Sequence, residues 1–190
     1  MAKAKKKAAK KPAAKKAAPK KAAAKKPASA AKAEPAVSGV GPVPAVQPYL
    51  CVKDPAAALA FYEKAFGFTT RYKLASPDGK VQHAEIGHGN GRIMLGPECP
   101  QSQDKAPSTI GGTAVTLYVY VANVDAVTAS AKATGGIVVQ EPQDMFWGDR
   151  CATVADPEGH RWCLATHVKD VTPQEIEKAM QSMQPVGAPN

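Results

Sequence analysis

Two ionisable side chains alternate with apolar ones along a short segment of this chain, and their types suit acid–base chemistry. His83 and Glu85 flank Ala84 within residues 81–86, which show the alternation of a half-buried strand. Side chains two residues apart on a strand project from the same face, so the imidazole and the carboxylate would project together. A carboxylate can act as a general base, an imidazole can assist it, and an arginine can stabilise an oxyanion. These chemical types predict a catalytic set of Glu85, His83 and Arg150.

Arg150 joins this set through an internal repeat with an offset of about 69 residues, which is a sign of duplicated architecture. The residues that recur at this offset include Val52, Ala57, Ala60 and Gly67, which correspond to Val121, Ala126, Ala129 and Gly136. The same offset maps His83 onto Ala152, so Arg150 is predicted to share that inward face. The duplication predicts one domain built from two similar modules, with a pocket on the concave faces of their sheets.

Each half of the repeat has the order strand, helix and then further strands. In the first half we expect strands at 47–52, 68–74, 81–86 and 92–95 and a helix at 55–66. In the second half we expect strands at 114–121, 137–140, 150–155 and 161–167 and a helix at 123–134. A capping box from Thr172 to Glu175 predicts a short C-terminal helix at 173–183. The predicted fold class is α+β, with paired βαβββ modules at about 46–97 and 114–168 inside one domain at 46–184.

Residues 1–35 differ from the rest of the chain, because they are almost wholly Lys, Ala and Pro. They hold 13 lysines and the single acid Glu34, so they carry +12, whereas the net charge of the whole chain is +9. With no large apolar side chain between Met1 and Val37, this segment cannot bury enough surface to offset its ordering entropy. We therefore predict a disordered tail at 1–35, followed by a Gly/Pro linker at 36–45.

The tail resembles the lysine-rich tails of linker histones, and flexible lysines can neutralise a phosphate backbone without reading its sequence. The predicted partner is DNA, bound without sequence preference, or another polyanion; the alternative is a tail that only solubilises the domain. The lysines predicted to make this contact are Lys5, Lys6, Lys7, Lys10, Lys11, Lys15, Lys16, Lys20, Lys21, Lys25 and Lys26.

Apolar runs and cysteines limit the expected location of the chain. No apolar run approaches the roughly 18 residues of a membrane span, so no membrane contact is predicted. The four cysteines form no CxxC pair, which favours a reduced cytoplasmic protein over a disulfide or zinc framework. The polybasic tail would allow such a protein to associate with the nucleoid.

Several motifs resemble the vicinal oxygen chelate superfamily, which comprises glyoxalases, bleomycin resistance proteins and extradiol dioxygenases. The sequences AFYEKAFGF at 60–68 and DPEGHRW at 156–162 are similar to motifs of that fold. The sequences HAEI at 83–86 and DMFWGDR at 144–150 are similar to its PhnB-like branch. The resemblance covers roughly residues 46–184 and implies the paired βαβββ fold, a small-molecule site in the cup between the modules, and a homodimer.

The resemblance also implies four metal-ligand positions, which are Gln47, Met94, Thr116 and Cys163 in this chain. Only Gln47 is a usual ligand there, since hard divalent ions prefer oxygen donors and zinc or nickel prefers imidazole or thiolate. We therefore expect no cofactor, with a divalent metal as the alternative. The expected function is binding of a small molecule. The alternatives are a lyase, isomerase or dioxygenase-type enzyme with Glu85 as its base, and a nucleic-acid-associated protein acting through its tail.

Strand alternation from these positions predicts which side chains line the cup, together with a loop that could cover it. The predicted ligand-binding residues are Gln47, Tyr49, Arg92, Met94, Thr116, Tyr118, Tyr120, Trp147 and Cys163, with His167 at the end of the last strand. An aromatic-lined concavity with a few convergent polar groups is typical of a small-molecule pocket.

Purely structural roles are the alternative for many of these residues. Glu85 would then form an ion pair with Arg150 or Arg92. Tyr118 and Tyr120 would pack at a dimer interface. The other structural assignments are His83 at the rim of a hairpin, Trp147 as a loop anchor, Asp144 and Asp149 as turn caps, His160 at the surface and Cys163 as an inert thiol.

Overall fold

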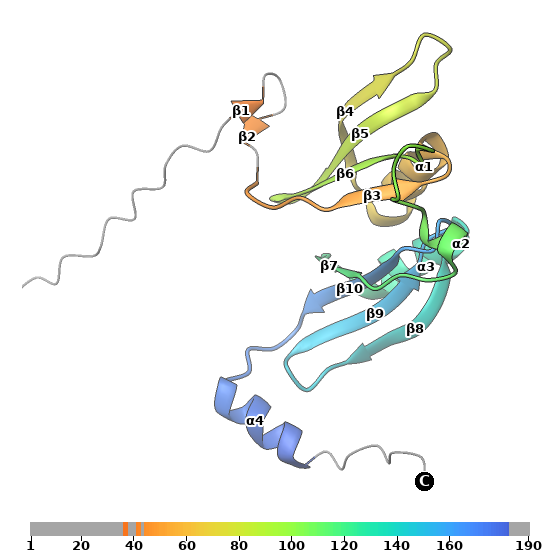
Figure 1. The fold of residues 1–190 in the computed structure, drawn as a ribbon. Coiled ribbons are helices and arrows are strands. Elements are labelled where there is room, and N and C mark those ends of the chain that lie inside the picture. Colours follow the sequence, from red (N-terminus) through yellow and green to blue (C-terminus); the bar gives the residue numbers. More distant parts are fainter. Residues whose placement is uncertain (1–35, 38–40, 43, 183–190) are drawn as a thin grey trace, which may run out of the picture. The chain divides into compact units, whose positions relative to one another are not determined.

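Two modules with the same order of elements follow one another in the computed structural model (Figure 1). The structure describes residues 36–37, 41–42 and 44–182, so the predicted lysine contacts lie outside the described residues. Module 1 contains β3 (Tyr49–Val52), α1 (Pro55–Phe66), β4 (Thr69–Ala75), β5 (Val81–His88) and β6 (Gly91–Pro97). Module 2 contains β7 (Thr116–Tyr120), α3 (Val124–Ala133), β8 (Ile137–Asp144), β9 (Asp149–Ala155) and β10 (Arg161–His167). The remaining elements are β1 (Ala36–Val37), β2 (Gly41–Pro42), α2 (Pro107–Ile110) and α4 (Pro173–Ser182).

Each module forms one mixed four-stranded sheet, with strand orders β3-β6-β5-β4 and β7-β10-β9-β8. The first strand of each module pairs in parallel with the last, and the other pairs are antiparallel. The predicted α+β class and its paired βαβββ modules are thereby confirmed. β3 and β7 are edge strands of their sheets.

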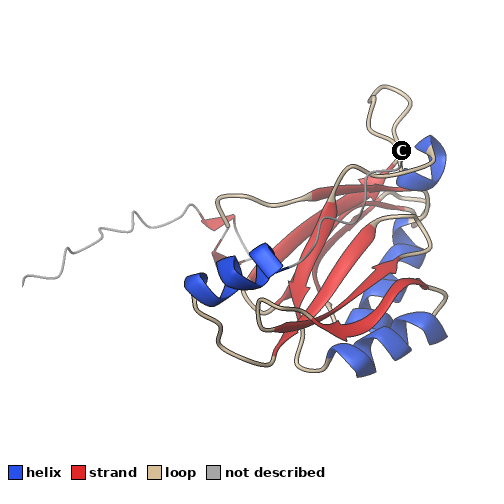
Figure 2. Ribbon diagram, turned by 90° about the horizontal axis from the view of Figure 1, so that it is seen from below, coloured by secondary structure: helices blue, strands red, loops and turns tan. Residues whose placement is uncertain are grey.

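α1 begins and ends where local sequence signals place its ends. The Asp54 side chain accepts hydrogen bonds from the amides of Ala56 and Ala57 at 2.9 and 3.0 Å, and Pro55 starts the helix. Gly67 ends it with a φ of 71°, in the left-handed region that glycine adopts without strain. α1 packs on β5 and lies beside α3, which packs on β8, β9 and β10 (Figures 1 and 2).

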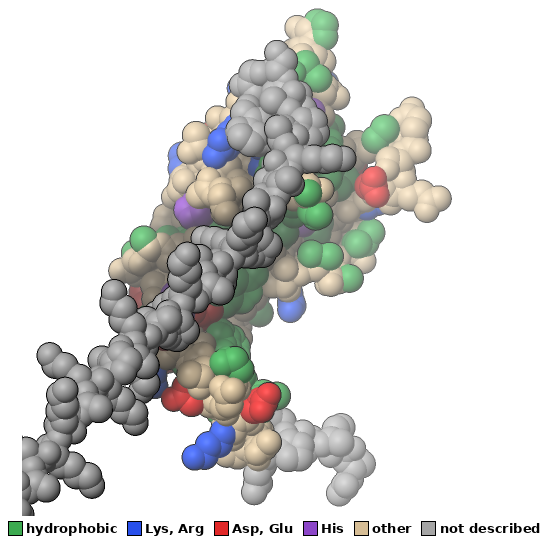
Figure 3. All heavy atoms as spheres, turned by 90° about the vertical axis from the view of Figure 1, so that its left-hand side faces the viewer, with side chains coloured by type: hydrophobic (Ala, Val, Ile, Leu, Met, Phe, Trp, Pro, Cys, Tyr) green, Lys and Arg blue, Asp and Glu red, His purple; other side chains and the backbone are tan. Residues whose placement is uncertain are grey.

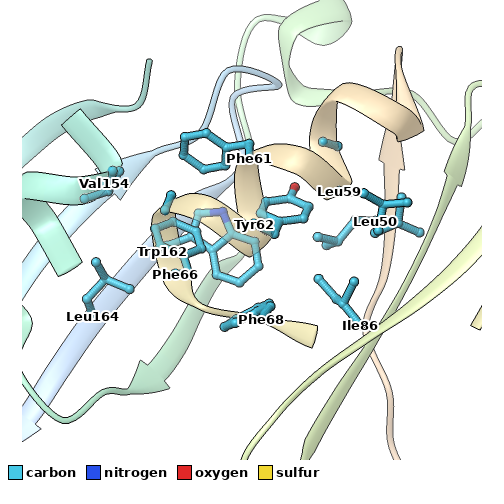
Figure 4. Packing of buried hydrophobic residues seen from close by; sticks show 14 of the residues in the cluster. Leu50, Leu59, Phe61, Tyr62, Phe66, Phe68, Ile86, Val154, Trp162 and Leu164 are labelled. Carbon is cyan, nitrogen blue, oxygen red and sulfur yellow. The ribbon is translucent and has the colours of Figure 1, made fainter. Parts of the chain in front are cut away.

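Aromatic side chains from both modules form the centre of the hydrophobic core (Figure 4). Tyr62 and Phe66 come from α1, Phe68 follows that helix, and Trp162 comes from β10. Tyr62 and Phe66 each lie 5.1 Å from Trp162 between ring centroids, and all three rings are fully or almost fully buried. Tilted aromatic pairs of this kind stabilise a core beyond the area they bury. The two modules therefore share one core.

The turn between β9 and β10 connects the modules through hydrogen bonds. Asp156 Oδ2 accepts from the Tyr62 hydroxyl at 2.7 Å and from Trp162 Nε1 at 2.9 Å. The Glu158 carboxylate accepts from the two backbone amides that precede α1, at 3.0 and 3.1 Å. Buried polar groups require such partners, so this turn has a structural role.

The expectation that His160 lies at the surface is wrong. Its side chain is buried, and its Nε2 lies 3.0 Å from the carbonyl oxygen of Cys51 on β3. Its backbone amide donates to Asp156 at 2.9 Å. The turn is polar in sequence, but it folds back onto module 1, and that long-range contact leaves no local sequence signal.

Some large hydrophobic side chains remain exposed, and Figure 3 shows hydrophobic groups on one face of the molecule. The exposed ones include Tyr49, Tyr118 and Tyr120, which lie on the two edge strands β3 and β7. Among the helices in the described part of the chain, none is long and apolar enough to cross a membrane.

Candidate functional site

The polar side chains of β5 lie on the face of the sheet that turns away from α1. Ala84 and Ile86 are fully buried in the core beneath that helix. His83 and Glu85 alternate with them, so they project from the opposite face. This face of module 1 therefore carries the carboxylate and the imidazole together.

Glu85 forms an ion pair with Arg92 of β6. Its Oε2 lies 3.1 Å from Arg92 Nη1, and both side chains are largely buried. Of the two partners expected for Glu85, Arg92 is therefore the observed one. Each charge compensates the other where solvent access is low, which makes this pair sensitive to the loss of either member.

His83 lies between Glu85 and two tyrosines. Its Nε2 is 3.9 Å from Glu85 Oε1, and its Nδ1 is 3.5 Å from the Tyr49 hydroxyl. The Tyr49 and Tyr72 rings lie 5.8 and 6.1 Å from the imidazole between centroids. Met94 pairs in register with both Tyr49 and Glu85, so the predicted residues of module 1 lie together. Burial raises the pKa of Tyr49, which keeps its phenol protonated.

Arg150 lies on the other face of its sheet, so the predicted inward position of Arg150, beside Glu85 and His83, is wrong. Its Nε and Nη2 donate to the Asp125 carboxylate on α3, both at 2.8 Å. Its Nη1 donates to Asp144 at 2.9 Å. These hydrogen bonds raise the pKa of Arg150 and hold it beside α3. The expected ion pair between Glu85 and Arg150 is wrong for the same reason.

A difference of one residue between the modules explains this error. The paired residues that flank the relevant turn are Ile86 with Ile93 in module 1 and Val154 with Trp162 in module 2. The second turn is therefore one residue longer, and the offset between β5 and β9 is 68 residues. A shift of one residue moves every side chain of a strand to the opposite face. Cys151, and not the core residue Ala152, thus corresponds to His83.

The same shift places Asp149 on the open face of module 2, although it was expected only to cap a turn. Asp149 is 4% exposed, and its Oδ2 accepts from the Tyr118 and Tyr120 hydroxyls at 3.0 and 2.9 Å. Its Oδ1 lies 2.9 Å from His167 Nδ1. The tyrosines reach from β7 across β10 to β9, because the β10 residue in their path, Ala165, is small. We call these four interacting residues the Asp149 cluster.

Module 1 repeats this crossing of a tyrosine over a small residue. A Cβ atom at Gly96 of β6 would collide with the Tyr49 hydroxyl. Tyr49 thus extends across β6 towards His83 on β5. Gly96 and Ala165 are equivalent in the repeat, so the two small residues are a sequence signal for this arrangement.

The protonation states in the Asp149 cluster follow from its contacts. Burial alone would raise the pKa of Asp149, but hydrogen bonds from His167, Tyr120 and Tyr118 hold it below its usual value. Hydrogen bonds to Asp149 and to Asp170, which is 3.0 Å from Nε2, raise the pKa of His167. Burial raises the pKa of Tyr118, and the hydrogen bond to Asp149 raises that of Tyr120. Both phenols therefore stay protonated and donate to a carboxylate.

Cys163 lies beside this cluster with its neighbour Cys151. The Cys151 sulfur is 3.2 Å from the Tyr118 hydroxyl. Burial, followed by the neighbouring Cys151, raises the pKa of Cys163 to about 11, so its thiol keeps its proton near neutral pH. The Trp147 indole also lies against the Tyr118 hydroxyl and packs edge-on against Phe146, with centroids 4.9 Å apart.

A cavity of about 490 Å³ lies between module 1 and β7, and we call it the seam cavity. The residues that line it include Phe68, Ile86, His88, Arg92, Leu117, Tyr118 and Tyr120. His88 Nε2 lies 3.1 Å from the backbone carbonyl of Tyr120, which connects β5 to β7 at this point. The seam cavity thus joins three predicted ligand-binding residues, Arg92, Tyr118 and Tyr120, from both modules.

Two other hollows contain few of the predicted residues. One of about 650 Å³ is lined by Tyr49 and Cys51 together with residues of the connection between the modules. Another of about 330 Å³ lies against α1 and the turn that carries Asp156 and Glu158, and it holds none of the predicted site residues. The seam cavity is therefore the better candidate site.

The four superfamily metal positions make a poor donor set in this chain. Gln47 precedes β3, and its buried Oε1 has no hydrogen-bond partner among the described residues. Met94 offers a thioether and Thr116 a neutral hydroxyl, and neither suits a hard divalent ion or zinc, so at most Gln47 and Cys163 remain as donors. Within residues 44–182, no three His, Cys, Asp or Glu side chains are grouped to hold a metal ion. These residues do not fit the metal that the fold family implies.

Sequence reasoning missed Asp149 as the centre of the second polar cluster. The signal that could have found it is the longer turn in module 2, because DPEGH at 156–160 contains one residue more than its counterpart in module 1. The predicted lysines at 5–26 lie outside the described residues.

Known proteins share this chain's sequence and fold. The model of the glyoxalase/bleomycin resistance protein/dioxygenase superfamily matches residues 43–164. An uncharacterized protein of Mycobacterium bovis is 40% identical over 142 residues, which cover 73% of this chain and 93% of that protein. An uncharacterized protein of Mycobacterium tuberculosis has the same identity, over 84% of its own length.

Solved structures share the fold over about two thirds of the chain. TioX from Micromonospora sp. ML1 is 28% identical, with a TM-score of 0.52 and coverage of 67% of this chain and 98% of that one. A gene product of Arabidopsis thaliana is 20% identical, with a TM-score of 0.53 and coverage of 65% and 98%. A mutant glyoxalase I of Zea mays is 23% identical, with a TM-score of 0.50 and coverage of 66% and 44%. The last two likenesses show the fold alone.

Proposed function

The chain belongs to the glyoxalase/bleomycin resistance protein/dioxygenase superfamily, and from this premise we propose that it binds a small polar or aromatic molecule in the seam cavity. The observation that carries the proposal is that Arg92, Tyr118 and Tyr120, from different modules, line one cavity of about 490 Å³. A concave, mostly apolar site with a few polar groups is typical of small-molecule binding. We also propose that it belongs to the PhnB-like branch of the superfamily; the support is the resemblance of HAEI at 83–86 and DMFWGDR at 144–150 to that branch.

Binding without the superfamily metal is part of this proposal. Its support is the donor chemistry of Met94 and Thr116, since a thioether and a neutral hydroxyl are poor ligands both for hard divalent ions and for zinc or nickel. A ligand would then be held by ring faces and hydrogen bonds alone.

Catalysis by a lyase, isomerase or dioxygenase-type mechanism is the alternative, with Glu85 as the general base and His83 assisting. The geometry favours binding over this alternative. Arg150, the group needed to stabilise an oxyanion, is held by Asp125 on the other face of its sheet. Arg92 is already engaged with Glu85, at 3.1 Å.

A homodimer is proposed on the same family grounds. Its support in this chain is the exposure of hydrophobic residues such as Tyr49 and Leu74 on the edge strands β3 and β4, since exposed apolar groups mark association sites. Light scattering behind size-exclusion chromatography tests this, and a monomer at micromolar concentration would contradict it.

The polybasic tail carries a second proposed function, which is sequence-independent binding of DNA or another polyanion. Its support is the charge of residues 1–35, which hold 13 lysines and one acid. If about six lysines engage at once, the slope of log K against log salt should be near −5. A chain starting at Val37 should lose this affinity, and undiminished DNA binding by that chain would contradict the proposal.

The test of the principal proposal is a thermal-shift screen of small metabolites followed by calorimetry on the full chain. A bound ligand stabilises the fold by an amount that grows with the logarithm of its concentration relative to Kd. Replacing Tyr118 or Tyr120 with Ala should abolish the binding, whereas Tyr72→Ala, a tyrosine outside the seam cavity, should leave it unchanged. Equal binding by all three variants would refute the seam cavity as the site.

A further inference from the structure

We propose that the seam cavity selects a small organic ammonium ion, which would lie against the rings of Tyr118 and Tyr120. This inference rests on the proposed function and narrows its ligand class.

The first step of the argument is the arrangement of the two rings. Tyr118 and Tyr120 are 47% and 57% exposed, and both line the seam cavity. Their centroids are 5.4 Å apart and their planes are inclined by 56°. An ammonium group within about 6 Å of a tyrosine ring face is attracted by the negative charge density of that face. Two inclined rings form two adjacent walls of a cation site.

The second step concerns the hydroxyl protons of these tyrosines. Both phenols donate to the same oxygen of Asp149, at 3.0 and 2.9 Å. A hydroxyl has one proton and two acceptor lone pairs. The Tyr118 oxygen already contacts the Cys151 sulfur at 3.2 Å and the Trp147 indole, so the Tyr120 oxygen is the one that offers an acceptor to an incoming molecule. An N–H or O–H donor of a cationic ligand matches this acceptor, whereas a carboxylate or phosphate would be repelled by it.

The third step is the charge behind the rings. Asp149 is buried and carries its charge near neutral pH, since its pKa is lowered by its three hydrogen bonds. His167 offsets that charge, but its second nitrogen faces Asp170 at 3.0 Å, so the three groups together are net negative. Arg92, the cation that lines the cavity, is paired with Glu85. The net negative charge of Asp149, His167 and Asp170, together with the pairing of Arg92 with Glu85, therefore favours binding of a cation.

The experiment compares two molecules of nearly the same shape that differ in charge. Choline and its uncharged isostere 3,3-dimethylbutan-1-ol are titrated into the full-length protein and followed by calorimetry and by NMR of the ligand. Cation–π attraction at partly desolvated sites corresponds to an affinity preference for choline of roughly tenfold. Tyr120→Leu should remove that preference, Tyr120→Phe should keep most of it, and Tyr72→Leu should not change it.

Equal affinity for the two probes, or binding of neither, would overturn the ammonium inference. Circular dichroism first shows whether each variant is folded. If Tyr120→Leu fails to fold, the test rests on the parent chain and on Tyr120→Phe, which should both prefer choline. A different result would contradict the proposed function. In that result, a neutral aromatic ligand found by the thermal-shift screen binds to Tyr118→Ala and Tyr120→Ala as tightly as to the parent chain.

Discussion

The hydrogen bonds of Asp156 should make the two modules unfold as one unit, and replacing this aspartate tests that coupling. Asp156→Asn keeps the shape of the side chain but replaces a carboxylate oxygen with an amide group. Asp156 Oδ2 accepts from the Tyr62 hydroxyl and the Trp162 indole N–H at 2.7 and 2.9 Å, and Oδ1 accepts from the Glu158 and His160 amides at 3.0 and 2.9 Å. Either orientation of the asparagine amide therefore leaves two donors facing an NH2 group. The Tyr62 and Trp162 side chains have no solvent exposure, so water cannot replace the lost acceptor there. Leaving a buried donor unsatisfied costs about 1–3 kcal/mol, so two donors predict a loss of about 2–6 kcal/mol.

Urea denaturation measures this loss. With an m-value of about 1–3 kcal/mol per M, a loss of 3 kcal/mol lowers the midpoint by about 1–3 M. Tyr62→Phe removes one of the two donors and should cost less than Asp156→Asn, and the double variant should be less unstable than the sum of the two. Asp78→Asn, in an exposed turn, is the matched control and should stay within about 0.5 kcal/mol of the parent chain. If Asp156→Asn behaved like Asp78→Asn, or if the modules unfolded in two steps, the reasoning would be refuted.

Four further predictions concern the polar clusters and the absence of a metal from the proposed mode of binding. Arg92→Ala should lower the urea midpoint more than Arg150→Ala, because it removes the arginine from the largely buried Glu85 and leaves only His83, at 3.9 Å. Breaking a buried ion pair costs about 3–5 kcal/mol. Equal effects of the two variants would contradict the ion-pair assignment. The pKa of His167 is raised above its ordinary 6.5. Its stabilising contribution is therefore fully present below pH 6.5 and is lost as the pH rises through the raised value. A pH series of melting temperatures should show this decline in the parent chain and not in His167→Gln. The pKa of Asp149 is lowered from 3.8, so its contribution is present above pH 3.8 and is lost as the pH falls through the lowered value, a step that should vanish in Asp149→Asn. A chelator should leave the melting temperature of the full chain unchanged, and stoichiometric metal in the purified protein would contradict the proposed mode of binding.

Local sequence signals predicted the elements of this fold because each signal acts within a few residues. Asp54 and Gly67 define the ends of α1 through their own hydrogen bonds and backbone conformation. The alternation around Ala84 and Ile86 indicated which side of β5 faces the core. The repeat then predicted that a second module would have the same order of elements.

The candidate site was predictable only where that repeat kept a constant offset. Tyr118 and Tyr120 lie on β7, where the offset of 69 residues holds. Arg150 and Asp149 lie on β9, where the longer turn reduces the offset to 68 and exchanges the two faces. A single extra residue in a turn leaves the composition and the strand pattern unchanged, so it becomes visible only when the DPEGH turn at 156–160 is aligned with its shorter counterpart in module 1.

Contacts between modules were the other limit. Nothing in the local sequence around His160 indicates that its ring meets the Cys51 carbonyl, more than 100 residues away. The approach of Arg92 to β7 in the seam cavity depends likewise on how the two sheets are placed by their shared core. Such contacts arise from packing of whole elements.

The central claim is that a small molecule binds in the seam cavity without a metal, and a crystallographic fragment screen of the full-length protein tests it most directly. Soaked aromatic and ammonium fragments should lie against Tyr118 and Tyr120, between module 1 and β7. An X-ray fluorescence scan of the same crystals should show no metal in stoichiometric amount. Fragments bound only outside this cavity, or a metal ion held at Gln47, Met94, Thr116 and Cys163, would contradict the claim.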